Sequence, residues 1–143
     1  MERLEIKTSI KINKLPPEVF YAIVNPENMT KYFISSSTGF MKEGEVLTWK
    51  FPEMDMEFPV TVSKIVNGTY ISFYWNPVMD GEQTLVEITL KKEAENKTTV
   101  TATEKSKPND AAGIKWLKDN TEGWAHFLAC LKAWMEHGIN LRR

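Results

Sequence analysis

The sequence predicts an α+β fold in which one long helix packs against an antiparallel sheet. Three observations lead to this prediction. The last quarter of the chain, residues 119–138, carries apolar side chains at helical spacing. Residues 35–105 consist of short alternating segments separated by turn residues, which is typical of a strand meander. Finally, the expected helices lie only at the two ends of this meander, as in sheets that are covered by helix on one face.

The chain begins with a predicted strand and two short helices. Residues 3–13 alternate between apolar and polar side chains, which indicates a strand with one buried face. The prolines at 16–17 suit the start of a helix, and Pro26 ends that helix because proline cannot continue it. A second helical turn is expected over residues 28–33.

The middle of the chain is predicted to be a meander of about six strands. The dipeptide Asn67-Gly68 between two apolar runs is a strong hairpin signal. Further turns are expected at residues 77–81 and 95–97. We expect the strands at residues 38–41, 46–51, 57–66, 69–76, 83–92 and 98–105.

Two helices are predicted to close the chain. A short helical piece is expected over residues 111–118, followed by the long helix, which Asp119 or Asn120 would cap. Gly138 is the residue type most often found just past a helix end. The apolar face of the long helix needs a sheet to cover it, and is formed by Trp124, Phe127, Leu128, Leu131, Trp134 and Met135.

Length and composition indicate one cytoplasmic domain, residues 1–143. The formal net charge of −1 provides no general field for nucleic acid or an anionic membrane. No apolar run reaches the roughly 20 residues that cross a bilayer, and the first residues lack the apolar block of a secretion signal. Cys130 is the only cysteine, so an internal disulfide is impossible, which fits a reducing compartment.

Three stretches of the sequence carry a family resemblance. Residues 10–26 combine a strand, two prolines, a Glu-Val-aromatic helix and an Asn-Pro stop. Residues 86–104 contain a final pair of strands, and residues 123–132 read Gly-Trp-Ala-His-Phe-Leu-Ala-Cys-Leu-Lys. In this order they resemble the START-like (SRPBCC, helix-grip) superfamily. The branch they are most similar to is the C-terminal domain of the activator of the 90-kDa heat-shock protein ATPase.

The resemblance implies a Bet v 1-like architecture, in which a curved antiparallel sheet wraps around the long C-terminal helix, with two short helices after the first strand. It also implies a space between sheet and helix that either is filled by side chains or holds a small hydrophobic ligand. Strand alternation and helical spacing assign the side chains that face this space. The candidate ligand contacts are Trp49, Phe58, Val60, Phe73, Trp75, Trp124, Leu128, Leu131 and Met135.

Glu104 is the one charged candidate for this ligand-binding site. It follows Thr98, Val100 and Ala102 on one face of its strand, so alternation points it inward near the open end. Buried there, it would be an acid or an anchor for a ligand. The alternative is a solvated carboxylate at the end of a strand, because glutamate is seldom buried without a partner.

Motifs for catalysis, cofactors and metals are not indicated. His126 and His137 lack metal-ligand spacing, and the sequence contains no phosphate-binding loop or nucleophile elbow. Cys130 is interpreted as a small apolar residue without a nearby base. The carboxylates from Glu53 to Glu57 are interpreted as a solvated acidic turn.

Three functions remain open at this point. The first is binding of a small lipid-like or aromatic molecule between the sheet and the C-terminal helix. The second is a co-chaperone-like interaction that stimulates a heat-shock chaperone ATPase, as the resemblance implies. The third is a cyclase-like or hydrolase-like enzyme acting on an apolar substrate, because such relatives work through pocket shape and need no strong motif.

Overall fold

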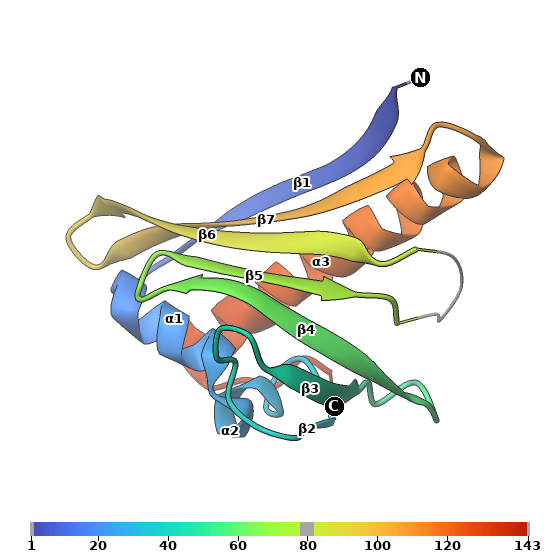
Figure 1. Ribbon diagram of the computed structural model, residues 1–143. Coiled ribbons are helices and arrows are strands. Elements are labelled where there is room, and N and C mark those ends of the chain that lie inside the picture. The colour runs from blue at the N-terminus through green and yellow to red at the C-terminus, as the bar shows by residue number, and fades with distance from the viewer. Residues whose placement is uncertain (1, 78–81, 143) are drawn as a thin grey trace.

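The computed structural model describes residues 2–77 and 82–142, so most of the turn expected at 77–81 lies outside the described residues. The described chain forms a seven-stranded antiparallel sheet with a long helix across one face (Figure 1). This is the predicted helix-grip fold. Its elements are β1 (Arg3–Ile12), α1 (Pro16–Val24), α2 (Pro26–Met29), β2 (Ser36–Ser37), β3 (Val46–Lys50), β4 (Glu57–Val66), β5 (Tyr70–Trp75), β6 (Thr84–Ala94), β7 (Lys97–Pro108) and α3 (Ala111–His137).

The sheet follows the chain as a meander, except that β1 pairs with β7 at one edge, giving the order β1-β7-β6-β5-β4-β3-β2. Strand alternation sets which side chains face α3. The register places one residue from each of five neighbouring strands in a single interior row, in the order Ile6, Glu104, Val86, Phe73 and Val62. All five are at most 2% exposed, and Glu104 is the only charged one.

Two early elements differ from the prediction. The second helix begins at Pro26, not at residue 28, because the Asn25 side chain caps it by accepting a hydrogen bond from the Glu27 N–H. The strand expected at 38–41 is wrong in position: no strand residue occurs there, and a two-residue strand, β2, precedes it at Ser36–Ser37. Immediately after it, the hydroxyl of Ser37 donates to the carbonyl of Gly39, and such a local bond competes with strand pairing.

The two closing helices of the prediction are one continuous helix, α3. Its N-cap is Asp110, whose carboxylate accepts a hydrogen bond from the N–H of Gly113 at 2.8 Å. The predicted caps have other roles: Asp119 pairs with Lys115 at 2.7 Å, and Asn120 donates to the carbonyl one turn earlier. These bonds lie within the helix, so the prediction of a new start at residue 119 is wrong.

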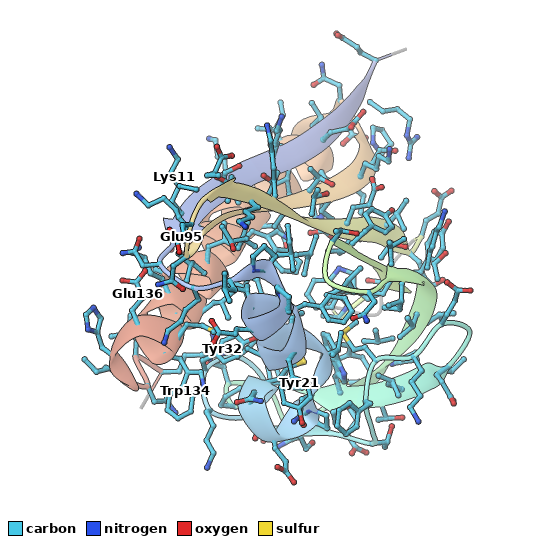
Figure 2. The ribbon with its side chains drawn as sticks, turned by 90° about the vertical axis from the view of Figure 1, so that its left-hand side faces the viewer. Lys11, Tyr21, Tyr32, Glu95, Trp134 and Glu136 are labelled. Atoms are coloured by element: carbon cyan, nitrogen blue, oxygen red, sulfur yellow. The ribbon has the colours of Figure 1, made fainter. Side chains whose placement is uncertain are left out.

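Both ends of α3 are fastened to the sheet. A Cβ added at Gly113 would lie only 1.9 Å from the carbonyl oxygen of Pro108, so only glycine permits this approach to β7. At the other end, Glu136 accepts from the backbone N–H of Asn13 at 2.8 Å and from Lys132 at 2.7 Å. Figure 2 shows Glu136 on the side of the molecule where Lys11 of β1 also lies.

Candidate functional site

An aromatic cavity of about 260 Å³ lies between the sheet and the middle of α3. Four phenylalanine and tryptophan rings line it, and each comes from a different part of the chain: Phe33 follows α2, Phe51 follows β3, Trp75 ends β5, and Trp124 belongs to α3, as does His126, which also lines the cavity. The centroids of the Trp75 and Trp124 rings are 5.4 Å apart, and those of Phe33 and Phe51 are 5.3 Å apart. We refer to this space as the aromatic cavity.

Gly123 keeps the helix side of this cavity open. It lines the cavity, and a Cβ added there would meet no atom within 4 Å. Glycine inside a helix costs about 0.5–1 kcal/mol relative to alanine. The packing of α3 does not require this glycine, which leaves room where a side chain would project.

A buried carboxylate holds the two tryptophans of the cavity in place. Glu104 is 2% exposed, and its two oxygens accept hydrogen bonds from the indole N–H groups of Trp75 at 3.0 Å and Trp124 at 2.7 Å. The hydroxyl of Thr84 also donates to it, at 2.5 Å. The solvated alternative for Glu104 is therefore wrong. Hydrogen bonds to an ionised acceptor are the strong ones, so this carboxylate fixes both ring orientations.

A second cavity of about 520 Å³ lies toward the N-terminal half of α3, and we call it the polar cavity because several charged side chains line it. Glu104 and Thr84 line it from the sheet, and Asp110, Lys115 and Asp119 line it from the helix side. Pro77 and Asn120 border both cavities. The tryptophan pair and its carboxylate thus stand between an aromatic space and a polar one.

Arg142, near the C-terminus, contributes to one wall of the aromatic cavity. Arg142 lines it and pairs with Glu53, and its guanidinium lies 5.9 Å from the centre of the Phe51 ring. The Arg142 side chain is 15% exposed, whereas that of Glu53 is 62% exposed. Glu53 is therefore more than part of a solvated acidic turn, since it bonds a cation at the cavity.

The predicted site residues fall into two groups. Trp75, Trp124 and Glu104 line the cavities already described, and Met135 lines a more open hollow beside α1 together with Trp134. The other six are buried, and none lines these three spaces. We call this group the filled region: Trp49, Phe58, Val60, Phe73, Leu128 and Leu131. The role of all ten in ligand binding stays a prediction.

Sequence reasoning missed Phe33, Gly123 and the pair of Arg142 with Glu53 as parts of the cavity. Phe33 lies in a segment without strand alternation, so no periodicity marks which way its ring points. The two residues of the ion pair are 89 positions apart, and no motif links them. A glycine in the middle of the apolar helix was the only available signal for an open space.

Catalytic chemistry is not apparent in the described residues. No group of three or more His, Cys, Asp or Glu side chains that could hold a metal occurs among them. His126 Nε2 lies 3.4 Å from the Cys130 sulfur, so the prediction that no base lies near this cysteine is wrong. Burial nevertheless raises the pKa of the Cys130 thiol, which disfavours the reactive thiolate. Among the described helices, none is long and apolar enough to cross a membrane.

The meander of strands around a C-terminal helix, with two short helices after the first strand, defines a START-like protein of the helix-grip class. The sequence profile of one family of this class matches residues 14–136, and its description is activator of Hsp90 ATPase homolog 1-like protein. The chain belongs to this family, so the resemblance predicted from the sequence is confirmed.

Solved structures share this fold. A Staphylococcus saprophyticus protein has a TM-score of 0.83 and 29% identity, with 97% of this chain and 96% of that chain covered. The Aha1 dimer from Colwellia psychrerythraea has a TM-score of 0.81 and 20% identity, over 94% of this chain and 98% of that one. A Bacillus halodurans protein has a TM-score of 0.77 and 20% identity, with 95% of this chain and 100% of that chain covered. At 20% identity the likeness concerns the fold alone. The search of curated proteins gives no match.

Proposed function

We propose that this protein binds a small hydrophobic molecule in the aromatic cavity between the sheet and α3. One observation carries the proposal: four phenylalanine and tryptophan rings from separate segments line a single space of about 260 Å³. Aromatic walls with a few polar groups are typical of small-molecule sites. Rigid rings also give a large contact area at a low cost in side-chain entropy.

The arrangement of Glu104 supports binding more than catalysis. Its oxygens accept from the two indoles that line the cavity, and it lines the polar cavity. A carboxylate in this position orients the walls of a site without lining the aromatic cavity itself. We therefore assign Glu104 a positioning role, and Trp75 and Trp124 the role of ligand contacts.

A titration with an uncharged dye, N-phenyl-1-naphthylamine, tests the proposal through the dye's own fluorescence. The decisive variant is Gly123→Leu, because Gly123 lines the cavity and a Cβ added there meets no atom within 4 Å, so a larger side chain has room to occupy that space. The matched control is Ala125→Leu, which adds the same side chain at an exposed position of α3. We expect saturable binding to the wild type and to Ala125→Leu, and at least tenfold weaker binding to Gly123→Leu. Equal affinity in all three proteins would remove the site from the aromatic cavity.

The family description favours a second candidate, a co-chaperone role. A protein with that role would raise the ATP turnover of the 90-kDa heat-shock chaperone when added in excess. Unchanged turnover at saturating protein would eliminate it. Loss of dye binding in Gly123→Leu with unchanged stimulation of the chaperone would assign the two activities to different parts of the molecule.

We also propose that the chain acts as one domain in the cytoplasm. The single cysteine, Cys130, is free and buried, which suits a reducing compartment. Localisation of a tagged protein by cell fractionation checks this proposal, and recovery in a secreted fraction would contradict it.

A further inference from the structure

We infer that the ligand of the aromatic cavity is a flat apolar acid, whose carboxylate Arg142 binds in place of Glu53. This inference rests on the proposed function and adds the chemical class of the ligand. It depends on the position of Arg142, on the incomplete use of its guanidinium, and on the exposure of Glu53.

Arg142 is placed to meet a ligand within the cavity. Among the described residues that line the aromatic cavity, it is the only lysine or arginine. Its side chain is 15% exposed, and its guanidinium lies over the ring of Phe51, one of the cavity walls. A group bound against Phe51 would therefore lie beside a largely buried positive charge.

The hydrogen-bonding capacity of this guanidinium is only partly used. Both of its bonds to Glu53 come from the same nitrogen, Nη2. The Nε–H group is buried and has no partner among the described residues. A guanidinium offers pairs of parallel N–H groups that match the two oxygens of a carboxylate. A carboxylate inside the cavity could therefore satisfy Nε together with a terminal nitrogen.

Glu53 shows that this guanidinium accepts a carboxylate, and Glu53 is also free to leave it. The residue lies between β3 and β4, outside both strands, and its side chain is 62% exposed. Released from Arg142, it would be hydrated at little cost, whereas a ligand carboxylate would keep the buried charge paired. We therefore interpret Glu53 as an internal substitute for the ligand's acid group.

The other carboxylate of the region does not oppose this assignment. Glu104 lines the polar cavity and not the aromatic one, and both of its oxygens accept hydrogen bonds from neighbouring side chains. The four rings favour a flat hydrocarbon body in the remaining space. Together these features indicate an aromatic carboxylic acid as the ligand class.

The test compares 1-naphthaleneacetate with 1-naphthaleneacetamide, which has nearly the same shape but no charge, by isothermal titration calorimetry. We expect the acid to bind wild-type protein at least tenfold more tightly than the amide. Arg142→Gln should bring the two affinities together, and Arg142→Lys should keep only part of the preference because it lacks the planar fork. Glu53→Gln should strengthen acid binding several-fold and leave amide binding unchanged, since it removes the competing carboxylate.

Arg3→Gln is the matched control. Arg3 is the first residue of β1, donates a hydrogen bond to Ser106 of β7 and does not line the cavity. This variant should keep the full preference for the acid. Equal affinities of acid and amide for the wild type would overturn the inference while leaving the proposed function intact. A preference that survives Arg142→Gln would overturn it as well. Failure of both compounds to bind would count against the proposed function itself.

Discussion

Two parts of the same interior differ in the hydrogen bonding of their tryptophan side chains. In the filled region, Trp49 is 0% exposed, and its indole N–H has no hydrogen-bond partner among the described residues. At the cavities, the indole N–H groups of Trp75 and Trp124 both reach Glu104. The Trp49 and Trp75 rings are neighbours, with centroids 6.2 Å apart. The boundary between packed core and candidate site therefore passes between two adjacent rings.

This difference shows that strand alternation determines which side chains are buried, but not whether a buried side chain packs in the core or lines a cavity. Trp49 and Trp75 both occupy inward positions of their strands, and so does Glu104. What separates the two regions is one acidic residue in a row of apolar ones. By accepting three hydrogen bonds, it holds two rings at the border of a space that close packing would otherwise fill.

The largest expected effect comes from Glu104→Gln. The amide is neutral and presents an N–H₂ group to neighbours that are themselves donors, so at least one buried donor loses its acceptor. We expect the free energy of unfolding to fall by about 2–4 kcal/mol. Urea denaturation measures this, with Glu93→Gln on an exposed part of β6 as the matched control, which should stay within about 0.5 kcal/mol of wild type. An unchanged midpoint for Glu104→Gln would remove the distinction between the two regions.

A paired substitution sharpens the same comparison at the rings. Trp124→Phe removes a donor to an ionised acceptor, and we expect a loss of about 2–3 kcal/mol. Trp49→Phe removes an N–H group that has no partner, so relief of that cost partly offsets the lost packing, and its destabilisation should be about 1 kcal/mol smaller. Thermal or urea unfolding of both variants gives the difference. Equal losses would mean that the bond to Glu104 contributes nothing.

The smallest effect is expected at Glu136, which ties α3 to the end of β1 and is also sensitive to pH. The hydrogen bond from Lys132, and next that from the N–H of Asn13, lower the pKa of the Glu136 carboxyl. The stability it contributes is complete above the unfolded glutamate pKa of about 4.3, and is lost as the pH falls through the lower folded pKa. Glu136→Gln should therefore destabilise by about 1 kcal/mol at pH 7.

Unfolding curves measured from pH 7 to pH 3 check this sign. The difference between wild type and Glu136→Gln should shrink on the acid side of that range, because the wild-type carboxyl becomes neutral as well. A difference that stays constant with pH would mean that the charge of Glu136 has no part in fastening the helix.

Most of the fold could be predicted because alternation and turn residues are local signals. β4 has the predicted bounds, and β1, β5 and β7 differ by a few residues at their ends. The helix start and the first short strand were mispredicted at residues whose polar side chains can bond to more than one nearby backbone group or side chain. Asp119 and Asn120 read as caps, yet they bond within α3, and Ser37 turns the chain where a strand was expected.

The candidate site was less predictable because its polar members meet only through the tertiary fold. Trp75 and Trp124 followed from periodicity, but their common bond to Glu104 depends on how β7 lies against α3. The pairing of Arg142 with Glu53 depends on a segment beyond the last helix, for which the sequence contains no periodic signal. Burial can be read from a pattern, whereas the choice of a hydrogen-bond partner requires coordinates.

The fastening of α3 at both ends has a consequence for how a molecule would reach the interior. At one end Gly113 lies close against Pro108, at the end of β7, and at the other end Glu136 accepts from Asn13 and Lys132 donates to the carbonyl of Lys11, so the helix is held against the sheet near both ends. Glu53 and Arg142 line the cavity and Glu53 is exposed, so a route beside this pair would leave these attachments intact. The opening and closing of the cavity would then depend on the ion pair between Arg142 and the exposed Glu53, so the rate of ligand exchange should respond to salt.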